Sequence, residues 1–141
     1  MPQYDVHDMR LLLILTFLLT GYTGLLRADS YEEASSALAR GDQQQALRIF
    51  KHLARQEDAA SQYQLGMLYL FGQGVDQDLV AGIEWLKRAA LNGDYLAANE
   101  LGQIYMTGRG VAVDEAEAIR WVEQASRIAA QNEGVAEDGC E

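Results

Sequence analysis

The chain has 141 residues, 49% of them hydrophobic, so it suits one small domain and excludes a large multidomain enzyme. Its 21 acidic against 11 basic residues give a formal net charge of −10, and such a surface repels phosphate groups, which argues against nucleic acid as a partner. The single cysteine, Cys140, allows no internal disulfide and no cysteine-based metal site, so the fold must depend on packing.

The first 28 residues have the pattern of an export signal. Arg10 precedes an apolar run, and a turn-prone stretch with small residues leads out of it. The run at 11–26 is about four residues short of the roughly 20 that a membrane-spanning helix needs, which favours cleavage over anchoring. We therefore predict residues 1–28 as a signal peptide or export segment, with either Met1 or Met9 as the start. The predicted location is the periplasm, and the alternative is an inner-membrane anchor.

Residues 59–94 and 95–130 are two copies of one sequence unit. Aligned without a gap at an offset of 36, the copies share ten identical positions, where composition alone gives roughly two or three. Such a period is typical of stacked repeats, in which each unit is too small to bury its own apolar face. The identical pairs are Leu65 with Leu101, Gly66 with Gly102, Tyr69 with Tyr105, Gly72 with Gly108, Gly74 with Gly110, Val75 with Val111, Asp78 with Asp114, Ile83 with Ile119, Trp85 with Trp121, and Ala89 with Ala125.

Each copy is predicted to fold as a helical hairpin. In the first copy, Leu65, Leu68 and Gly72 recur at spacings of three and four, which places them on one helical stripe. Gly72 and Gly74 then end the helix, because glycine adopts positive φ at low steric cost. Asp78 is the predicted N-cap of the second helix, since its carboxylate can accept from amides of the first turn.

Residues 29–58 form a weaker third unit. Ser30 and Asp42 are the predicted N-caps of two helices, which a tight glycine turn separates. Shifted by 36 residues, the second of these helices is in register with its counterparts in the two copies, although the Gly-x-Gly turn is missing. The sequence thus predicts an all-α repeat domain at 29–130, made of three antiparallel hairpins and six helices, and an acidic, disordered tail at 131–141.

The two copies resemble the Sel-one-like repeat, a relative of the tetratricopeptide repeat with a longer turn inside each hairpin. The motif runs Leu65-Gly66-x-x-Tyr69-x-x-Gly72-x-Gly74-Val75-x-x-Asp78, then Ile83-x-Trp85-x-x-x-Ala89-Ala90-x-x-Gly93. The second copy follows it through Ala125, but has Ser126 for the second alanine and lacks the closing glycine. The unit at 29–58 is closer to a plain tetratricopeptide hairpin. The resemblance implies a right-handed α-solenoid that acts as an adaptor for protein complexes, often in bacterial envelopes.

No pattern favours catalysis, a metal or a cofactor. His52 is the one histidine beyond the export segment, and we expect it to be a partly exposed structural residue. No serine lies in a Gly-x-Ser-x-Gly or Ser-x-x-Lys pattern. The turns at 72–74 and 108–110 follow no predicted strand and lack the P-loop lysine, so we do not expect them to bind phosphate. We therefore predict a protein that is not an enzyme and needs no cofactor.

The outward positions of the first helix differ between the two copies. They hold Tyr63, Met67, Leu70 and Phe71 in the first copy, and Asn99, Gln103, Met106 and Thr107 in the second. Two interpretations stay open for the apolar set. It packs against the N-terminal hairpin, or it forms an exposed patch on the inner face of the solenoid that binds a peptide or a partner helix.

The last predicted helix offers a second candidate surface. It keeps Trp121, Ala125 and Ile128 on the side that we expect to face a following hairpin. Terminal repeats need a polar outer face to stay soluble, so this apolar side should be covered by the tail, a second copy or a partner. We therefore expect association, including self-association, through the C-terminal helix.

The leading interpretation is an exported, non-catalytic adaptor of the bacterial envelope that binds other proteins. Membrane contact is expected only if the N-terminal segment is retained, in which case the chain would be a membrane-tethered regulator. A further alternative is an envelope hydrolase acting on cell-wall or β-lactam substrates, which rests only on activities attributed to relatives.

Overall fold

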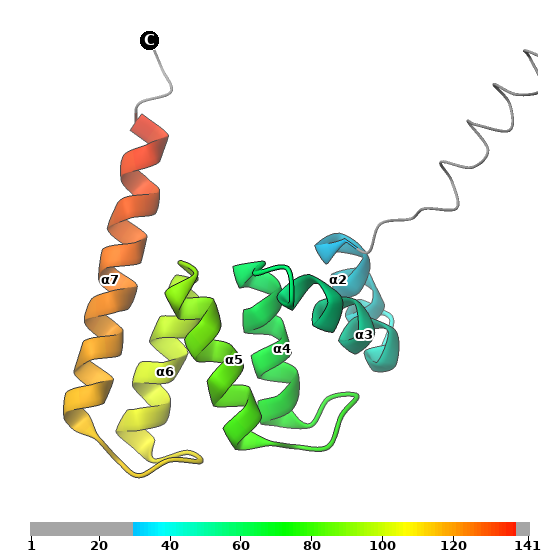
Figure 1. Cartoon of the computed structure of the whole chain (residues 1–141), viewed down its shortest axis with the longest axis horizontal. Helices are drawn as coiled ribbons and strands as arrows, with labels where there is room; N and C mark the ends of the chain where they lie inside the picture. The colour runs from blue at the N-terminus through cyan, green and yellow to red at the C-terminus, as the bar shows by residue number, and fades with distance from the viewer. Residues whose placement is uncertain (1–29, 138–141) are drawn as a thin grey trace, which may run out of the picture.

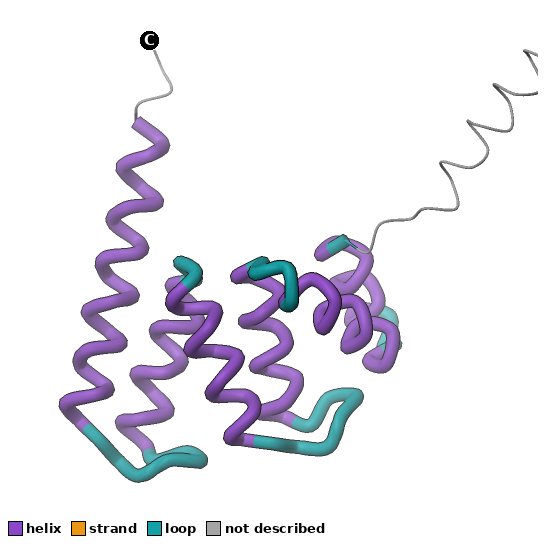
Figure 2. The backbone as a smooth tube through the Cα atoms, viewed as in Figure 1, coloured by secondary structure: helices purple, strands orange, loops and turns teal. Residues whose placement is uncertain are grey.

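The computed structural model describes residues 30–137, and this part of the chain contains six helices and no strands (Figures 1 and 2). The helices pair into three consecutive hairpins, and each packs mainly against its neighbours in sequence. The all-α solenoid expected from the sequence is therefore confirmed. The helices are α2 (Tyr31–Ala39), α3 (Gln43–Ala54), α4 (Ala59–Phe71), α5 (Leu79–Leu91), α6 (Tyr95–Thr107) and α7 (Glu115–Glu137).

Aspartates cap five of these helices and repeat at an interval of 36 residues. Asp42, Asp78 and Asp114 cap the second helix of each hairpin, and their Oδ1 atoms accept from the amide three residues further on at 3.0, 2.9 and 2.9 Å. Asp58 and Asp94 cap α4 and α6 in the same way, at 2.7 and 2.8 Å. A cap of this kind stabilises a helix by about 1 kcal/mol. The caps thus fix where each helix begins and keep the three hairpins in one register.

The long turns inside the last two hairpins pack against the preceding hairpin. Gly74 and Gly110 have φ of 72° and 78°, in the left-handed region. A Cβ at Gly74 would lie 2.8 Å from the carbonyl oxygen of Gln43, and a Cβ at Gly110 would lie 2.7 Å from the Cβ of Leu79. The side chain of Gln44 also donates to the Gly74 carbonyl at 2.7 Å. Glycine is therefore needed here both for the backbone conformation and for the close approach of neighbouring hairpins.

Two apolar clusters fill the solenoid. The first is shared by α2, α3 and α4 and contains Phe50, Leu65 and Leu68. The second is shared by α4, α5, α6 and α7 and contains Leu86 and Leu101. Because α4 contributes to both clusters, the burial of apolar surface joins all three hairpins into one body.

Glycines inside α4 and α6 allow the helices of each hairpin to approach closely. A Cβ at Gly66 would lie 3.0 Å from both the carbonyl oxygen of Gly82 and the side chain of Leu86. A Cβ at Gly102 would lie 2.7 Å from the Cγ2 of Val122. This close packing explains why glycine is kept at both positions despite its cost of about 1 kcal/mol in a helix interior.

The last helix is longer than the sequence analysis predicts. The predicted repeat domain ends near Ala130, but α7 continues to Glu137 and extends well beyond α6 in Figure 1. The prediction of a disordered tail at 131–141 is therefore wrong for residues 131–137. Residues 131–137 have no apolar stripe and so resemble a tail in sequence, yet they continue an existing helix, for which the unfavourable nucleation step is already complete.

The export segment predicted at 1–28 and Cys140 both lie outside the described residues. Within residues 30–137, no helix combines the length and the hydropathy needed to cross a bilayer. The longest helix, α7, carries ionisable side chains along its first four turns, including Glu117, Arg120 and Arg127.

Candidate functional site

The apolar stripe predicted to point outward from α4 is largely covered. Leu70 is fully buried, and a Cβ at Gly82 would lie 2.7 Å from its Cγ. Tyr63 and Met67 are partly buried against the cluster that α5, α6 and α7 build. The expectation of an outward-facing set is thus wrong for Leu70, and the packing that the structure shows is toward the following hairpin and not toward the N-terminal one.

Tyr63 also interacts electrostatically with carboxylates at the start of α6 and within it. Burial raises the pKa of its phenol, and the nearby carboxylates of Glu100 and Asp94 raise this pKa further. The phenol is therefore neutral at physiological pH and acts as a packing residue with a polar edge.

Phe71 is the member of this set that stays at the surface. Half of its side chain is exposed, and the guanidinium of Arg109 lies 4.6 Å from the ring centroid. The same guanidinium group donates to the carbonyl of Leu70 at 3.4 Å. Phe71 thus helps to hold the turn between α6 and α7 against α4 through a cation–π contact.

The corresponding positions of α6 are exposed. Asn99 and Gln103 are polar and exposed, and Met106 is 50% exposed. They are the counterparts of Tyr63, Met67 and Leu70, which α6 and α7 help to cover. Between residues 30 and 137 no further hairpin covers α6, so the change to polar side chains matches the exposure of these positions.

The free side of α7 differs from the predicted one. Ala125 and Ile128 are only 3% and 4% exposed and belong to the core cluster, so the prediction that they face outward is wrong. Among residues 115–133 of this helix, the exposed large apolar residues are Ile119 and Val122, at 48% and 46%. Their counterparts in the preceding hairpin, Ile83 and Leu86, are almost completely buried in the second cluster.

This comparison between hairpins defines a terminal face on α6 and α7. We use this name for Asn99, Gln103, Met106, Ile119 and Val122. The counterparts of its three apolar members lie together in one buried cluster of the preceding hairpin, so these members form one surface here. This face could have been found from the sequence by aligning the two copies, because the apolar stripe that contains Ile83 recurs at Ile119.

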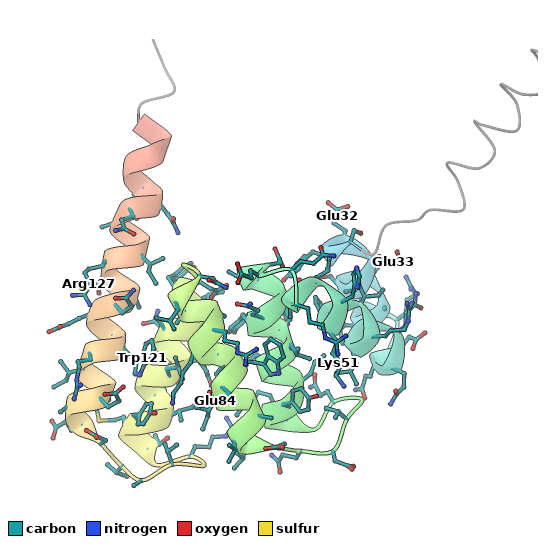
Figure 3. All side chains as sticks on the ribbon, in the orientation of Figure 1. Glu32, Glu33, Lys51, Glu84, Trp121 and Arg127 are labelled. Atoms are coloured by element: carbon teal, nitrogen blue, oxygen red, sulfur yellow. The ribbon has the colours of Figure 1, made fainter. Side chains whose placement is uncertain are left out.

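Trp121 lies beside a hollow between the end of α5 and α7. It is partly buried, and its indole Nε1 has no hydrogen-bond acceptor among the described residues. The hollow has a volume of about 270 Å³, and Figure 3 shows Trp121 and Arg127 on the same helix. Its lining residues are Leu91, Glu117, Arg120, Trp121, Gln124 and Arg127.

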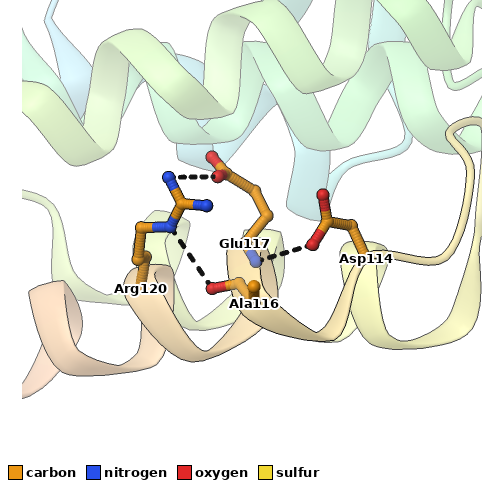
Figure 4. A network of polar contacts seen from close by, with 4 residues as sticks. All are labelled: Asp114, Ala116, Glu117 and Arg120. Carbon is orange, nitrogen blue, oxygen red and sulfur yellow. Dashed lines mark hydrogen bonds and ion pairs between the residues drawn. The ribbon is translucent and has the colours of Figure 1, made fainter.

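The two arginines beside this hollow already have polar partners. The Arg120 guanidinium lies 3.3 Å from the carboxylate of Glu117, whose amide donates to the Asp114 cap (Figure 4). Arg127 donates to the side-chain oxygen of Gln124 at 3.0 Å. A ligand would have to compete with these contacts, which makes this hollow a weak site for an anion.

The residues considered for metal or phosphate binding in residues 30–137 form no cluster around a common point. These residues contain no group of three or more His, Cys, Asp or Glu side chains placed to hold a metal ion. His52 is exposed, and its Nε2 lies 3.0 Å from the Nε2 of Gln56. The turns at 72–74 and 108–110 pack against neighbouring helices, which accounts for their glycines without a phosphate.

Two solved structures have a similar fold. A Sel1 repeat protein from Oxalobacter formigenes is 26% identical with a TM-score of 0.57, and the match covers 60% of this chain and 34% of that chain. A protective antigen of uropathogenic Escherichia coli strains, described as displaying an SLR fold, is 34% identical with a TM-score of 0.57, and the match covers 67% and 22%. The chain therefore spans about a third or less of the length of either relative. Comparison with curated proteins gives no significant match.

The sequence pattern of a known family matches the last two hairpins. The family model described as Sel1 repeat matches residues 59–94 and 96–127, which correspond to α4–α5 and to α6 with most of α7. Sel1 repeats generally mediate interactions between proteins. The match agrees with the two copies that the sequence analysis identified by their spacing. The chain is a Sel1-like repeat protein, with its two Sel1 repeats at residues 59–94 and 96–127.

Proposed function

We propose that this chain is a non-catalytic adaptor of the bacterial envelope, which binds a partner protein through the terminal face. One observation carries the proposal: Met106, Ile119 and Val122 are each about half exposed, whereas their counterparts in the preceding hairpin are buried. Three apolar side chains on adjoining helices offer the kind of surface that another helix covers.

The partner element that fits this face best is an amphipathic helix or helical hairpin. The equivalent face of α4 and α5 is covered by the hairpin α6–α7, which provides a template for the contact. Asn99 and Gln103 border the apolar residues with amide groups, as expected for the polar rim of a reversible interface. A second copy of the chain could supply the helix, so self-association belongs to the same proposal.

A double substitution tests the terminal face. Ile119→Ser with Val122→Ser removes two half-exposed side chains, so the far-ultraviolet circular dichroism should stay close to that of the wild type. Val80→Ser is the matched control, because Val80 is 67% exposed on α5 and lies outside the terminal face. We expect the double variant to lose partner capture from an envelope extract and the control to retain it. Equal capture by both variants would exclude this face as the docking surface.

Two measurements separate partner binding from self-association and place the protein in the cell. Analytical ultracentrifugation of the wild type and the double variant shows whether a second copy occupies the terminal face. Fractionation and mass spectrometry of the mature N-terminus distinguish a cleaved periplasmic protein from one that keeps residues 1–28 as an anchor. A cytoplasmic fraction with an intact N-terminus would contradict the envelope part of the proposal.

A further inference from the structure

A second hollow lies between the first two hairpins, where the ends of α3 and α5 meet the start of α4. Its volume is about 420 Å³, larger than that of the hollow beside Trp121. It occupies the equivalent place one repeat earlier, since Trp85 in its wall aligns with Trp121. Its lining residues are Ala54, Arg55, Glu57, Gln62, Trp85, Arg88, Leu91 and Asn92. We call it the arginine hollow.

The wall of the arginine hollow is held in place by hydrogen bonds. Gln62 is only 3% exposed, and its Nε2 donates to the carbonyl of Ala54 at 3.1 Å. Its Oε1 accepts from the Nδ2 of Asn92 at 2.9 Å. One buried side chain on α4 thus connects the ends of α3 and α5, so the hollow is pre-formed and needs little ordering when a ligand binds.

Two guanidinium groups border this hollow without an acidic partner. Arg55 and Arg88 are both exposed, and neither forms an ion pair with any residue between 30 and 137. Arg88 instead lies over the ring of Trp85, with its Cζ 4.7 Å from the ring centroid. In a chain of net charge −10, two cations left unpaired in one place form a local site of opposite sign.

The hollow beside Trp121 differs from the arginine hollow in the partners of its arginines. There, Arg120 forms an ion pair with Glu117, and Arg127 donates a hydrogen bond to the neutral amide of Gln124. At the positions of the hollow beside Trp121 that correspond to Arg55 and Arg88, the chain has Leu91 and Gln124, so neither cation recurs at the equivalent place in that hollow. The two positive charges are therefore specific to the junction between the first and second hairpins.

The remaining lining residues give the hollow an apolar wall and one acidic edge. Trp85 is partly buried and Leu91 is 74% exposed, so both offer apolar surface to a ligand. Glu57 is exposed and carries the one carboxylate among the lining residues. A ligand that fits this arrangement carries carboxylates near the two arginines and an apolar side chain near Trp85.

We propose that the arginine hollow binds an acidic peptide segment of the partner protein. Carboxylates of the peptide pair with Arg55 and Arg88, and an adjacent apolar side chain packs on Trp85 and Leu91. Both arginines and Leu91 are exposed, so the hollow is accessible to a continuous chain and does not enclose a small molecule. The inference rests on the proposed function in one respect, because its ligand is part of a protein.

Peptide binding to the full chain tests the proposal directly. The probe is a short fluorescein-labelled peptide that alternates glutamate with leucine, and the reference is the same peptide with glutamine for glutamate. Fluorescence anisotropy should show binding of the glutamate peptide alone, and binding should weaken as salt is raised. We expect Arg88→Gln and Arg55→Gln each to weaken binding about tenfold, the loss of one charge-assisted contact.

Matched variants separate the arginine hollow from general charge attraction. Arg120→Gln and Arg127→Gln remove the same charge from the hollow beside Trp121 and should leave peptide affinity within about twofold of the wild type. Glu57→Gln should strengthen binding, because it removes the one repelling carboxylate. Equal affinity for the two peptides, or equal losses in the two pairs of arginine variants, would overturn the proposal. Competition by citrate as effective as that by the unlabelled peptide would assign the site to small anions instead.

Failure of the arginine hollow to bind the peptide can be distinguished from failure of the proposed adaptor function. The Ile119→Ser, Val122→Ser variant should still bind the glutamate peptide, because the terminal face lies on a different hairpin. If the peptide fails to bind the wild type while the terminal face still captures a partner, the arginine hollow is excluded and the adaptor function stands. If the peptide binds the wild type but the terminal-face variant captures the partner normally, the arginine hollow is supported and the terminal face is excluded as the docking surface.

Discussion

The two Sel1 repeats share one sequence pattern but differ in what covers them. Leu70 and Leu86 in the first repeat are fully buried, whereas the aligned Met106 and Val122 in the second are 50% and 46% exposed. The same helix positions therefore contribute to the core in one copy and to the surface in the other. A repeat of this kind obtains its stability from its neighbours as much as from its own hairpin, and its uncovered end is the surface that we propose for docking.

Truncating aligned residues in the two repeats gives the largest expected contrast. Leu86→Ala should lower the free energy of unfolding by about 3 kcal/mol, because it leaves a cavity in the second cluster. Val122→Ala should lower it by no more than about 1 kcal/mol, since its side chain is half solvated already. Urea unfolding followed by circular dichroism measures both values. Similar losses would mean that an unseen contact covers the terminal face in the isolated protein.

The register of the repeats could be predicted from sequence because it depends on local chemistry. Asp78 and Asp114 cap helices by accepting from the amide three residues further on, and Gly74 and Gly110 supply the positive φ that the turns require. Each of these residues has a role set by the backbone of its own hairpin, so its recurrence at an offset of 36 locates the hairpins directly. The existence and order of the six helices followed from this periodicity.

The direction in which each stripe points was predicted poorly because every inner helix has two neighbours. On α4, Leu65 and Leu68 belong to the first cluster while Leu70 belongs to the second, so nearly the whole circumference is apolar. On α7 the wrong stripe was assigned to the free side, with Ile128 in place of Val122. Periodicity shows that a face is buried, but the stacking of hairpins decides against which partner.

The arginine hollow was not predicted at all, for a related reason. Arg55 and Arg88 are 33 positions apart and come from different repeats, so no local motif connects them. The sequence offers one indirect signal: the residues at the corresponding places of the next junction, Leu91 and Gln124, are uncharged, so the two junctions differ in charge. Sites that form between repeats are best sought at such departures.

The next largest expected difference is between a glycine in a turn inside a hairpin, Gly74, and a glycine in a turn between hairpins, Gly93. Gly74→Ala should cost about 2 kcal/mol or more, because φ is positive and the new Cβ would meet the carbonyl oxygen of Gln43 at 2.8 Å. Gly93→Ala should cost only about 1 kcal/mol, because φ is also positive but nothing lies within 4 Å of the added Cβ. Thermal unfolding of both variants measures the difference. Equal costs would show that the turn at Gly74 does not join the first two hairpins in solution.

The smallest contrast compares the turn after α3 with the turn after α5. Glu57 has a φ of 63°, and the aligned residue after α5 is Gly93, with a φ of 93°. A non-glycine residue in this conformation is strained, so Glu57→Gly should raise the free energy of unfolding by about 0.5 kcal/mol once the greater freedom of glycine in the unfolded chain is subtracted.

Glu57→Gln is the control for that substitution, because it keeps the strained backbone and removes only the carboxylate. We expect it to leave the free energy of unfolding unchanged while it strengthens binding of the glutamate peptide. Glu57→Gly should do both, since it relieves the backbone and removes the charge at the edge of the arginine hollow. If Glu57→Gly destabilises the protein, the side chain of Glu57 makes a stabilising contribution that outweighs its backbone strain.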